Sequence, residues 1–209
     1  MAHDAGSATS LAVEQRDVAR TRILHAARVV LAERGLDATV DDVAAAAGVS
    51  RRTVFRHFAT RDRLFAAAIG EGVRRYAQQI PPAPDGDDLR AWLLDLLVVT
   101  HRLNARNGRI YWELAVLAPD DLSDELAEAA AERRASRRRF AVAVTSRIWQ
   151  ARGGPGEPPS WLVDAVSVHL SGFSTQSLAG DFGRTPDEVA AVSAQVIEAA
   201  LAAALAAAR

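Results

Sequence analysis

The stretch that decides the fold is Thr39–Phe65, which reads TVDDVAAAAGVSRRTVFRHFATRDRLF. A short helix is expected to begin after Thr39, because Thr39 and Asp42 have the spacing of a capping box, with Asp in place of the usual Glu. Gly48 ends this helix, since glycine takes the left-handed turn conformation easily. Ser50 then caps a second short helix. Two short helices joined by about four residues that include a glycine describe a helix-turn-helix.

The apolar positions of this stretch have the spacing of a small core, formed by Val43, Ala44, Ala47, Val49, Val54 and Phe58. The small side chain of Ala44 lets the two helices approach, and Val54 anchors the second helix while its other faces stay exposed. The exposed face carries Arg51, Arg52, Thr53 and Arg56. Arginine suits bidentate contacts with guanine or phosphate, and helix N-termini attract phosphate oxygens. The alternative is an ordinary solvated basic face of a helical bundle.

Charge distribution supports a nucleic-acid partner for the N-terminal third. The formal net charge of the 209 residues is −1, but residues 16–75 hold twelve Arg against seven Asp and Glu. The basic surplus therefore coincides with the helix-turn-helix. With 49% hydrophobic and 24% charged residues, the chain is able to bury the core of one or two domains. The absence of cysteine excludes disulfides, thiolate metal sites and cysteine nucleophiles.

No targeting or membrane segment is expected. The start of the sequence lacks the basic and apolar regions of a signal peptide. The longest apolar run, residues 199–208, is half of the roughly 20 residues needed to cross a bilayer. We therefore expect a cytoplasmic protein with no membrane contact.

Helical periodicity dominates the rest of the chain and predicts an all-α architecture of about nine helices. Besides the two short helices, the expected ones cover about 16–34, 61–79, 89–103, 110–117, 122–151 and 161–181, and a last one begins near Thr185. Prolines and glycines between residues 81 and 86 and again between 153 and 159 mark the two clearest breaks.

The ordered pattern across residues 16–70, densest in Thr39–Phe65, resembles the TetR family of bacterial transcription regulators. The resemblance implies that Thr39 places its hydroxyl and amide on a phosphate. Phe55 stands where the family usually has Tyr, so the packing is kept and a hydroxyl contact to the DNA backbone is lost. Arg61 replaces the usual Lys beside a phosphate. Together with the exposed basic face, the predicted DNA-binding residues are Arg22, Thr39, Ser50, Arg51, Arg52, Thr53, Phe55, Arg56, His57 and Arg61.

The resemblance also implies a dimer formed by the last two helices. Independently, those helices carry two apolar stripes, Trp161, Ala165, Val168 and Gly172 on one and Val189, Val192, Val196, Ala199 and Ala203 on the other. This is more apolar surface than the edge of one monomer should expose. The alternative is that the stripes face the monomer's own core. A two-fold dimer presents two recognition helices to half-sites roughly 34 to 36 Å apart, so the operator should be an inverted repeat.

A small-molecule pocket is a further implication of the resemblance. The candidate lining residues are Trp92, Leu96, Trp112, Arg137, Phe140, Val144, His169, Phe173 and Gln176. Arg133 and Arg137 fall on the apolar stripe of the 122–151 helix, and buried charges need partners. Three interpretations stay open: the stripe faces solvent near Arg133, an acid such as Glu113 neutralises one arginine, or Arg137 binds an anionic group of a ligand. His169 is either a core histidine or a ligand contact.

These observations predict a homodimeric, TetR-like DNA-binding regulator, a repressor that a small lipophilic ligand releases from an inverted-repeat operator. The predicted domains are a flexible N-terminus at 1–15, the DNA-binding domain at 16–62 and a ligand-binding and dimerisation domain at 63–209. Catalytic motifs are absent, so we expect no enzyme, no cofactor and no metal. The alternatives are a structural helical dimer and a regulator without a small-molecule effector.

Overall fold

The computed structural model describes residues 4–84 and 88–208, and their side chains from Glu14 onward except that of residue 15. Every regular element in these residues is helical, which confirms the predicted fold class. The α-helices are α1 (Asp4–Arg34), α2 (Val40–Ala47), α3 (Arg51–His57), α4 (Arg61–Gln79), α5 (Leu89–Val116), α6 (Asp124–Ala151), α7 (Ser160–His169), α8 (Gly172–Phe182) and α9 (Pro186–Ala207), with short 3-10 turns η1 (Gly35–Asp37) and η2 (Pro119–Asp121).

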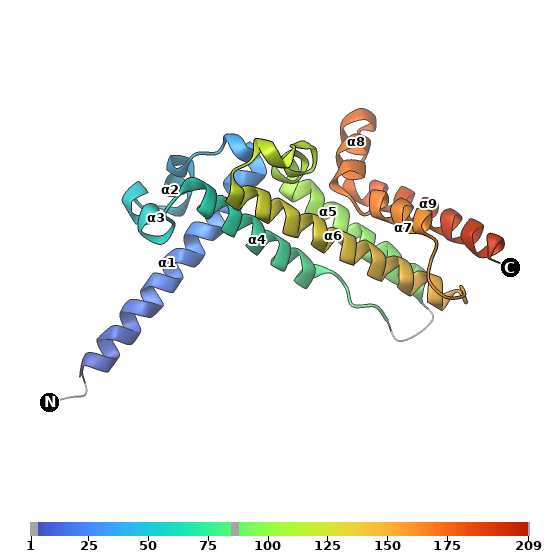
Figure 1. Cartoon of the computed structure of the whole chain (residues 1–209), viewed down its shortest axis with the longest axis horizontal. Helices are drawn as coiled ribbons and strands as arrows, with labels where there is room; N and C mark the ends of the chain where they lie inside the picture. The colour runs from blue at the N-terminus through green and yellow to red at the C-terminus, as the bar shows by residue number, and fades with distance from the viewer. Residues whose placement is uncertain (1–3, 85–87, 209) are drawn as a thin grey trace.

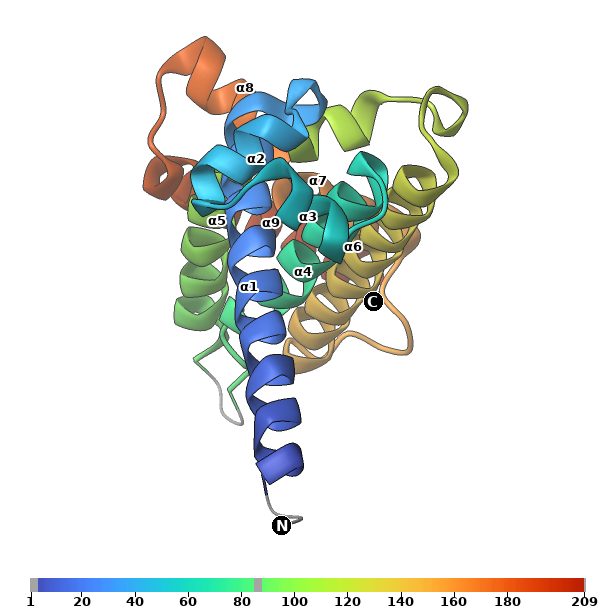
Figure 2. The same cartoon turned by 90° about the vertical axis from the view of Figure 1, so that its left-hand side faces the viewer.

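The helices divide between two ends of an elongated molecule. Figure 1 shows α2 and α3 at one end, α7 to α9 at the other, and α4, α5 and α6 running lengthwise between them. The N-terminal part of α1 extends away from the rest (Figures 1 and 2). This helix begins at Asp4 rather than near residue 16 as expected, because no proline interrupts the chain there. Residues 1–3 of the predicted flexible segment and Gly86 of the predicted break lie outside the described residues.

The predicted helix ends of the helix-turn-helix are confirmed. The hydroxyl of Thr39 accepts the amide N–H of Asp42 in a complete capping box, and Ser50 accepts the amide N–H of Thr53. Gly48 has a left-handed conformation with φ 61°, which glycine adopts without strain. The path of the chain into α3 is therefore set by local sequence.

One predicted helix boundary in the C-terminal part is wrong, and another lies at a kink. The expected helices at 89–103 and 110–117 are both present, and they meet at non-helical Gly108 (φ 1°, ψ −94°) within the element labelled α5. The expected single helix at 161–181 is divided into α7 and α8, because Ser171 caps a new helix by accepting the amide N–H of Ser174. The described residues carry nine α-helix labels, because the two helices that meet at Gly108 share one label and the expected helix at 161–181 has two.

Buried side chains form two clusters, and α5 and α6 contribute to both. The first joins α1 to α4 and includes Ile110 and Leu114 of α5, whereas the second joins α5, α6, α7 and α9 around Leu96 and Trp149. Phe65 on α4 belongs to the first cluster, so this core crosses the predicted domain boundary at residue 62. A displacement of α4 therefore moves the helix-turn-helix as well.

The last helix corrects the expectation that no segment is able to span a membrane. By length and composition alone, α9 is long and apolar enough to do so. Core helices of soluble proteins meet the same criteria. One face of α9 is buried in the second cluster through Ile197, Leu201 and Ala204. The packing of α9 is thus that of a helix in a bundle.

A buried histidine beneath the break between α7 and α8 makes stability depend on pH. Burial, and secondarily His169, lowers the pKa of His101 from 6.5 to about 4, while Nδ1 shares a 2.8 Å hydrogen bond with Thr175. Between these values the unfolded chain binds the proton and the folded chain does not, so stability falls as the pH decreases below 6.5.

We expect the free energy of unfolding to be about 2 kcal/mol lower at pH 5 than at pH 7.5 from His101 alone. Urea unfolding at both pH values measures this difference. His101→Asn should remove most of it, because asparagine keeps a polar atom near the Nδ1 position without titrating. His25→Asn, at an exposed position, is the matched control. An unchanged pH dependence in His101→Asn would contradict the assignment.

Candidate DNA-binding surface and ligand cavity

The recognition helix α3 presents the basic face that the sequence predicts. Val54 is buried under the helix, while Arg51, Arg52 and Arg56 are exposed. Arg51 pairs with Asp41 at 2.6 Å and lies over the ring of Phe55, 5.3 Å from its centroid. Neither Arg52 nor Arg56 has an ion-pair partner among the described residues. These two guanidinium groups are therefore available to a ligand outside the protein.

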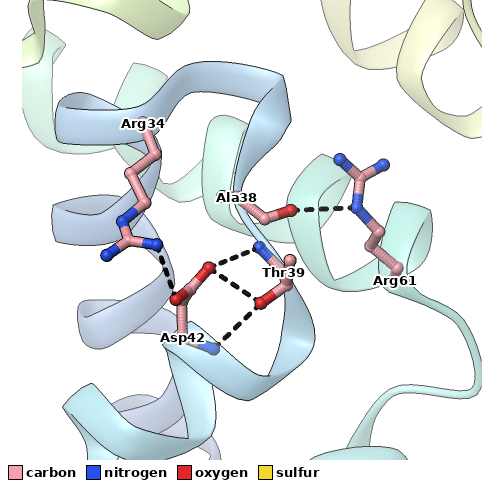
Figure 3. Close-up of polar contacts among 5 residues, drawn as sticks. All are labelled: Arg34, Ala38, Thr39, Asp42 and Arg61. Carbon is pink, nitrogen blue, oxygen red and sulfur yellow. Dashed lines mark hydrogen bonds and ion pairs between the residues drawn. The ribbon is translucent and has the colours of Figure 1, made fainter.

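In the chain without DNA the polar groups of Thr39 form hydrogen bonds inside the protein (Figure 3), and their contact with a phosphate stays a prediction. Its amide N–H and its hydroxyl both donate to Asp42 Oδ2, at 2.9 and 2.7 Å. Arg34 donates to the other carboxylate oxygen at 2.8 Å. Hydrogen bonds from the Thr39 hydroxyl and amide lower the pKa of Asp42, so this carboxylate is ionised at neutral pH. Thr39 thus stabilises the start of α2.

We expect Thr39→Ala to lower the free energy of unfolding by about 1 kcal/mol, the usual cost of losing an N-cap. Thr39→Ser should restore most of it, because serine keeps the hydroxyl. Chemical denaturation of the three proteins without DNA measures the effect. Equal stabilities, together with weaker DNA binding by Thr39→Ala, would instead support the phosphate contact.

Arg61 is likewise held by the protein rather than free for a phosphate. Its Nε donates to the carbonyl of Ala38 at 3.1 Å, as Figure 3 shows, and Nη2 donates to the carbonyl of Leu36. Nη1 pairs with Asp62 at 3.0 Å, and the guanidinium lies over the ring of Phe65. These contacts hold the guanidinium in the chain without DNA, and the phosphate contact stays a prediction. Arg61 joins the start of α4 to the loop before α2.

Two further predicted residues lie near the turn. Arg22 on α1 donates to the carbonyl of Gly48 at 3.2 Å and so supports the turn. His57 is half-buried with an unpartnered Nε2, and burial, followed by Arg56, Arg16 and Arg20, lowers its pKa. Arg16 and Arg20, which contribute to this effect on His57, are not among the predicted DNA-binding residues. Their spacing of four residues, about one helical turn, indicates that they share a face of α1.

Most of the predicted dimer surface is exposed in the monomer. On α9, Val192, Val196, Ala199 and Ala203 are exposed, and on α7 Trp161 and Val168 are exposed while Ala165 is half-buried, as is Gly172 at the start of α8. The prediction is wrong for Val189, which is fully buried in the core beneath α9. The alternative that the stripes face the monomer's own core thus holds for Val189 and not for these exposed residues.

A cavity of about 270 Å³ lies between α4, α5, α6, α7 and the start of α8. Its lining residues are Val73, Tyr76, Ala77, Ile80, Pro81, Pro82, Asn104, Tyr111, Arg133, Ser136, Arg137, Phe140, Ala141, Ser167, Leu170 and Gly172. Of the nine predicted pocket residues, only Arg137 and Phe140 line it. Arg137 and Phe140 were predicted because they lie on the apolar stripe of α6. The α4 residues that line the cavity were not predicted, because the sequence does not indicate which face of α4 packs toward α6.

The other seven predicted pocket residues lie elsewhere. Trp92, Leu96 and Val144 are buried in the second core cluster. The exposed rings of Trp112 and Phe173 stack on each other with centroids 5.7 Å apart, and Gln176 is also exposed. His169 shares a 3.3 Å hydrogen bond with Ser193, which fits the core alternative for this histidine.

An all-helical chain with an exposed arginine face on the second helix of a helix-turn-helix belongs to the class of DNA-binding proteins. Comparison with known proteins agrees. Residues 23–68 match the family model of the bacterial regulatory proteins of the tetR family. Residues 23–68 are thus a DNA-binding domain of the tetR family type, and the chain is similar to TetR-family transcriptional regulators.

Solved structures extend the similarity of the fold to most of the chain. A tetR-family transcriptional regulator from Streptomyces coelicolor is 23% identical, with a TM-score of 0.68 over 91% of this chain and 83% of that one. A TetR transcription regulator from Haloarcula marismortui is 21% identical, with a TM-score of 0.68 over 90% and 99%. FadR from Bacillus subtilis, solved in complex with stearoyl-CoA, is 16% identical, with a TM-score of 0.60 over 87% and 97%. No curated protein matches the sequence.

Proposed function

We propose that this regulator binds an inverted-repeat operator as a homodimer, acts as a repressor in the cytoplasm, and leaves the DNA when a small molecule fills the cavity. The observation that carries the proposal is the exposed face of α3, where Arg52 and Arg56 have no ion-pair partner in the described part of the chain. Arginine forks on a recognition helix suit guanine edges and phosphates. Residues 16–62 would form the DNA-binding domain and residues 63–209 the regulatory domain.

Dimerisation is supported by the apolar surface of α7 and α9. Exposed Val192 and Val196 on α9 lie one helical turn apart, and Trp161 shares a shallow hollow with Ala204 and Ala207 near the end of α9. The exposed faces of the two helices are therefore continuous at that end. A two-fold interface on this surface places two α3 helices in successive major grooves.

Coupling between ligand and DNA is supported by the position of α4. Phe65 near its start packs in the same core as α2 and α3, while Val73 and Tyr76 further along line the cavity. A ligand that favours one position of α4 thus favours one position of the recognition helix. The solved complex of the similarly folded Bacillus subtilis FadR with stearoyl-CoA supports a lipophilic molecule in this role.

The direct test is a mobility-shift assay with DNA from upstream of the protein's own gene, followed by footprinting. We expect two protected half-sites in inverted orientation, roughly 34 to 36 Å apart. Affinity should fall steeply with salt, because phosphate contacts release counterions. Binding that does not distinguish this DNA from an unrelated sequence at any salt concentration would contradict the proposal.

A further inference from the structure

The cavity holds buried positive charge without a carboxylate to balance it. Arg133 is only 6% exposed and lines the cavity together with Arg137, and no acidic residue is among the lining residues. Neither arginine belongs to an ion pair of the described residues, and Nη1 of Arg133 is buried without a hydrogen-bond partner. The guanidinium lies over the ring of Tyr111, 4.6 Å from its centroid, and this cation–π contact stabilises the charge without neutralising it.

Two of the three interpretations that the sequence left open are thereby removed. The stripe of α6 does not face solvent at Arg133, which is buried. Glu113 does not neutralise either arginine, because its carboxylate pairs with Arg109 at 2.7 Å and accepts the amide N–H of Leu36. The interpretation that remains is an anionic group supplied from outside the chain.

The nearby tyrosines are also unable to act as counter-ions. Burial raises the pKa of Tyr76 to about 12, and burial likewise raises that of Tyr111, so both phenols are neutral at physiological pH. Burial, and then the charge of Arg137, lowers the pKa of Arg133 to about 10, which still leaves it charged. A buried charge without a partner lowers the stability of the folded protein, so an arginine at this position indicates a role in binding.

The rest of the cavity is mainly apolar. Val73, Ile80, Phe140 and Leu170 line it, and its volume of about 270 Å³ lies near the lower end for pockets that hold small ligands. Arg137 already donates to the carbonyl of Ser167 at 3.4 Å, whereas the Arg133 fork has a free nitrogen. A planar carboxylate is able to accept two N–H groups of one guanidinium together.

We propose that the effector is a compact lipophilic carboxylic acid, whose carboxylate binds Arg133 with Arg137 beside it and whose apolar body lies against Phe140 and α4. This inference rests on the proposed small-molecule regulation and specifies its chemistry. The bound anion would neutralise the charge of a cavity that Val73 and Tyr76 of α4 also line.

The test is thermal unfolding and calorimetry of the full chain with octanoate, decanoate and 2-naphthoate, each compared with its neutral amide. We expect at least one carboxylate to raise the Tm and its amide to have little effect. Arg133→Met should weaken binding of that carboxylate at least tenfold and should itself raise the Tm without ligand, because a buried unpaired charge is removed. Arg138→Met, at an exposed position of the same helix, is the matched control.

Arg133→Lys is the second variant, for the case that Arg133→Met does not fold. Lysine keeps the positive charge but lacks the planar guanidinium, so this variant should also bind the carboxylate more weakly than the wild type. Equal stabilisation by acid and amide, or carboxylate binding that survives both variants, would overturn the inference. So would a series in which no carboxylate has an Arg133-dependent effect. DNA binding of the same samples is measured in parallel. If it stays intact, these outcomes refute the anionic effector and leave the DNA-binding function standing.

Discussion

Replacing Val196 by glutamate should convert the proposed dimer into a monomer and weaken operator binding at least 100-fold. Val196 is 40% exposed in the middle of the stripe formed by Val192, Ala199 and Ala203 on α9. A two-fold interface brings the same surface of both protomers together, so a carboxylate introduced there is buried twice without a partner. The loss in affinity follows because the two half-sites no longer bind as a unit, a linkage typically worth 10² to 10⁴ in affinity.

Light scattering after size exclusion measures the oligomeric state of Val196→Glu, and fluorescence anisotropy measures operator binding. Ala191→Glu introduces the same charge at an exposed position on α9 outside the stripe, so it should leave both properties unchanged. Circular dichroism checks that both variants keep their helices. A Val196→Glu protein that remains dimeric would show that the subunits meet on another surface.

Arg52→Ala should reduce operator affinity by about 10- to 100-fold and remove most of the preference for the operator over unrelated DNA. A bidentate contact with a base is worth roughly 1 to 3 kcal/mol of discrimination. Arg52 is exposed near the start of α3, and no described acid competes for its guanidinium. Binding to operator and to unrelated DNA at several salt concentrations separates base contacts from phosphate contacts.

The matched control is Arg63→Ala, which removes another exposed arginine of this region, one that pairs with Glu125 at 3.3 Å. It should leave the preference for the operator unchanged. Arg61→Ala should differ again, because it loses the hydrogen bonds to Ala38 and Leu36 and so lowers stability in the absence of DNA. If Arg52→Ala and wild type discriminate equally, bases are not read at this position.

The helix-turn-helix was predictable because its determinants are local. The capping box of Thr39, the cap of Ser50 and the turn at Gly48 each act within a few residues. The exposure of Arg52 follows from the helical period once Val54 is known to be buried. The same argument fails for Arg61, whose acceptors Leu36 and Ala38 lie more than twenty residues earlier in the chain.

In the C-terminal part, hydrophobic periodicity alone did not determine the helix ends or the buried face. The expected break between residues 103 and 110 is a kink at Gly108, after which Ile110 and Leu114 pack in the first core. The apolar pattern after Ser160 predicts one helix, but the N-cap at Ser171 divides this segment into α7 and α8. Val189 has the period of the exposed stripe of α9, and packing places it in the core. The hydrophobic periodicity of a helix identifies its apolar face but does not indicate which element packs against that face.

Residue order alone was enough for the helical class, the caps of the DNA-binding part and the basic face of α3, since each depends on hydrogen bonds and periodicity within one or two turns. Packing alone decided that Arg133 lies in a cavity without an acid and that α4 joins this cavity to the recognition helix. The physical reason is distance along the chain. Tyr76, Tyr111 and Arg133 come from three helices, and only the way those helices pack determines which sides face one another.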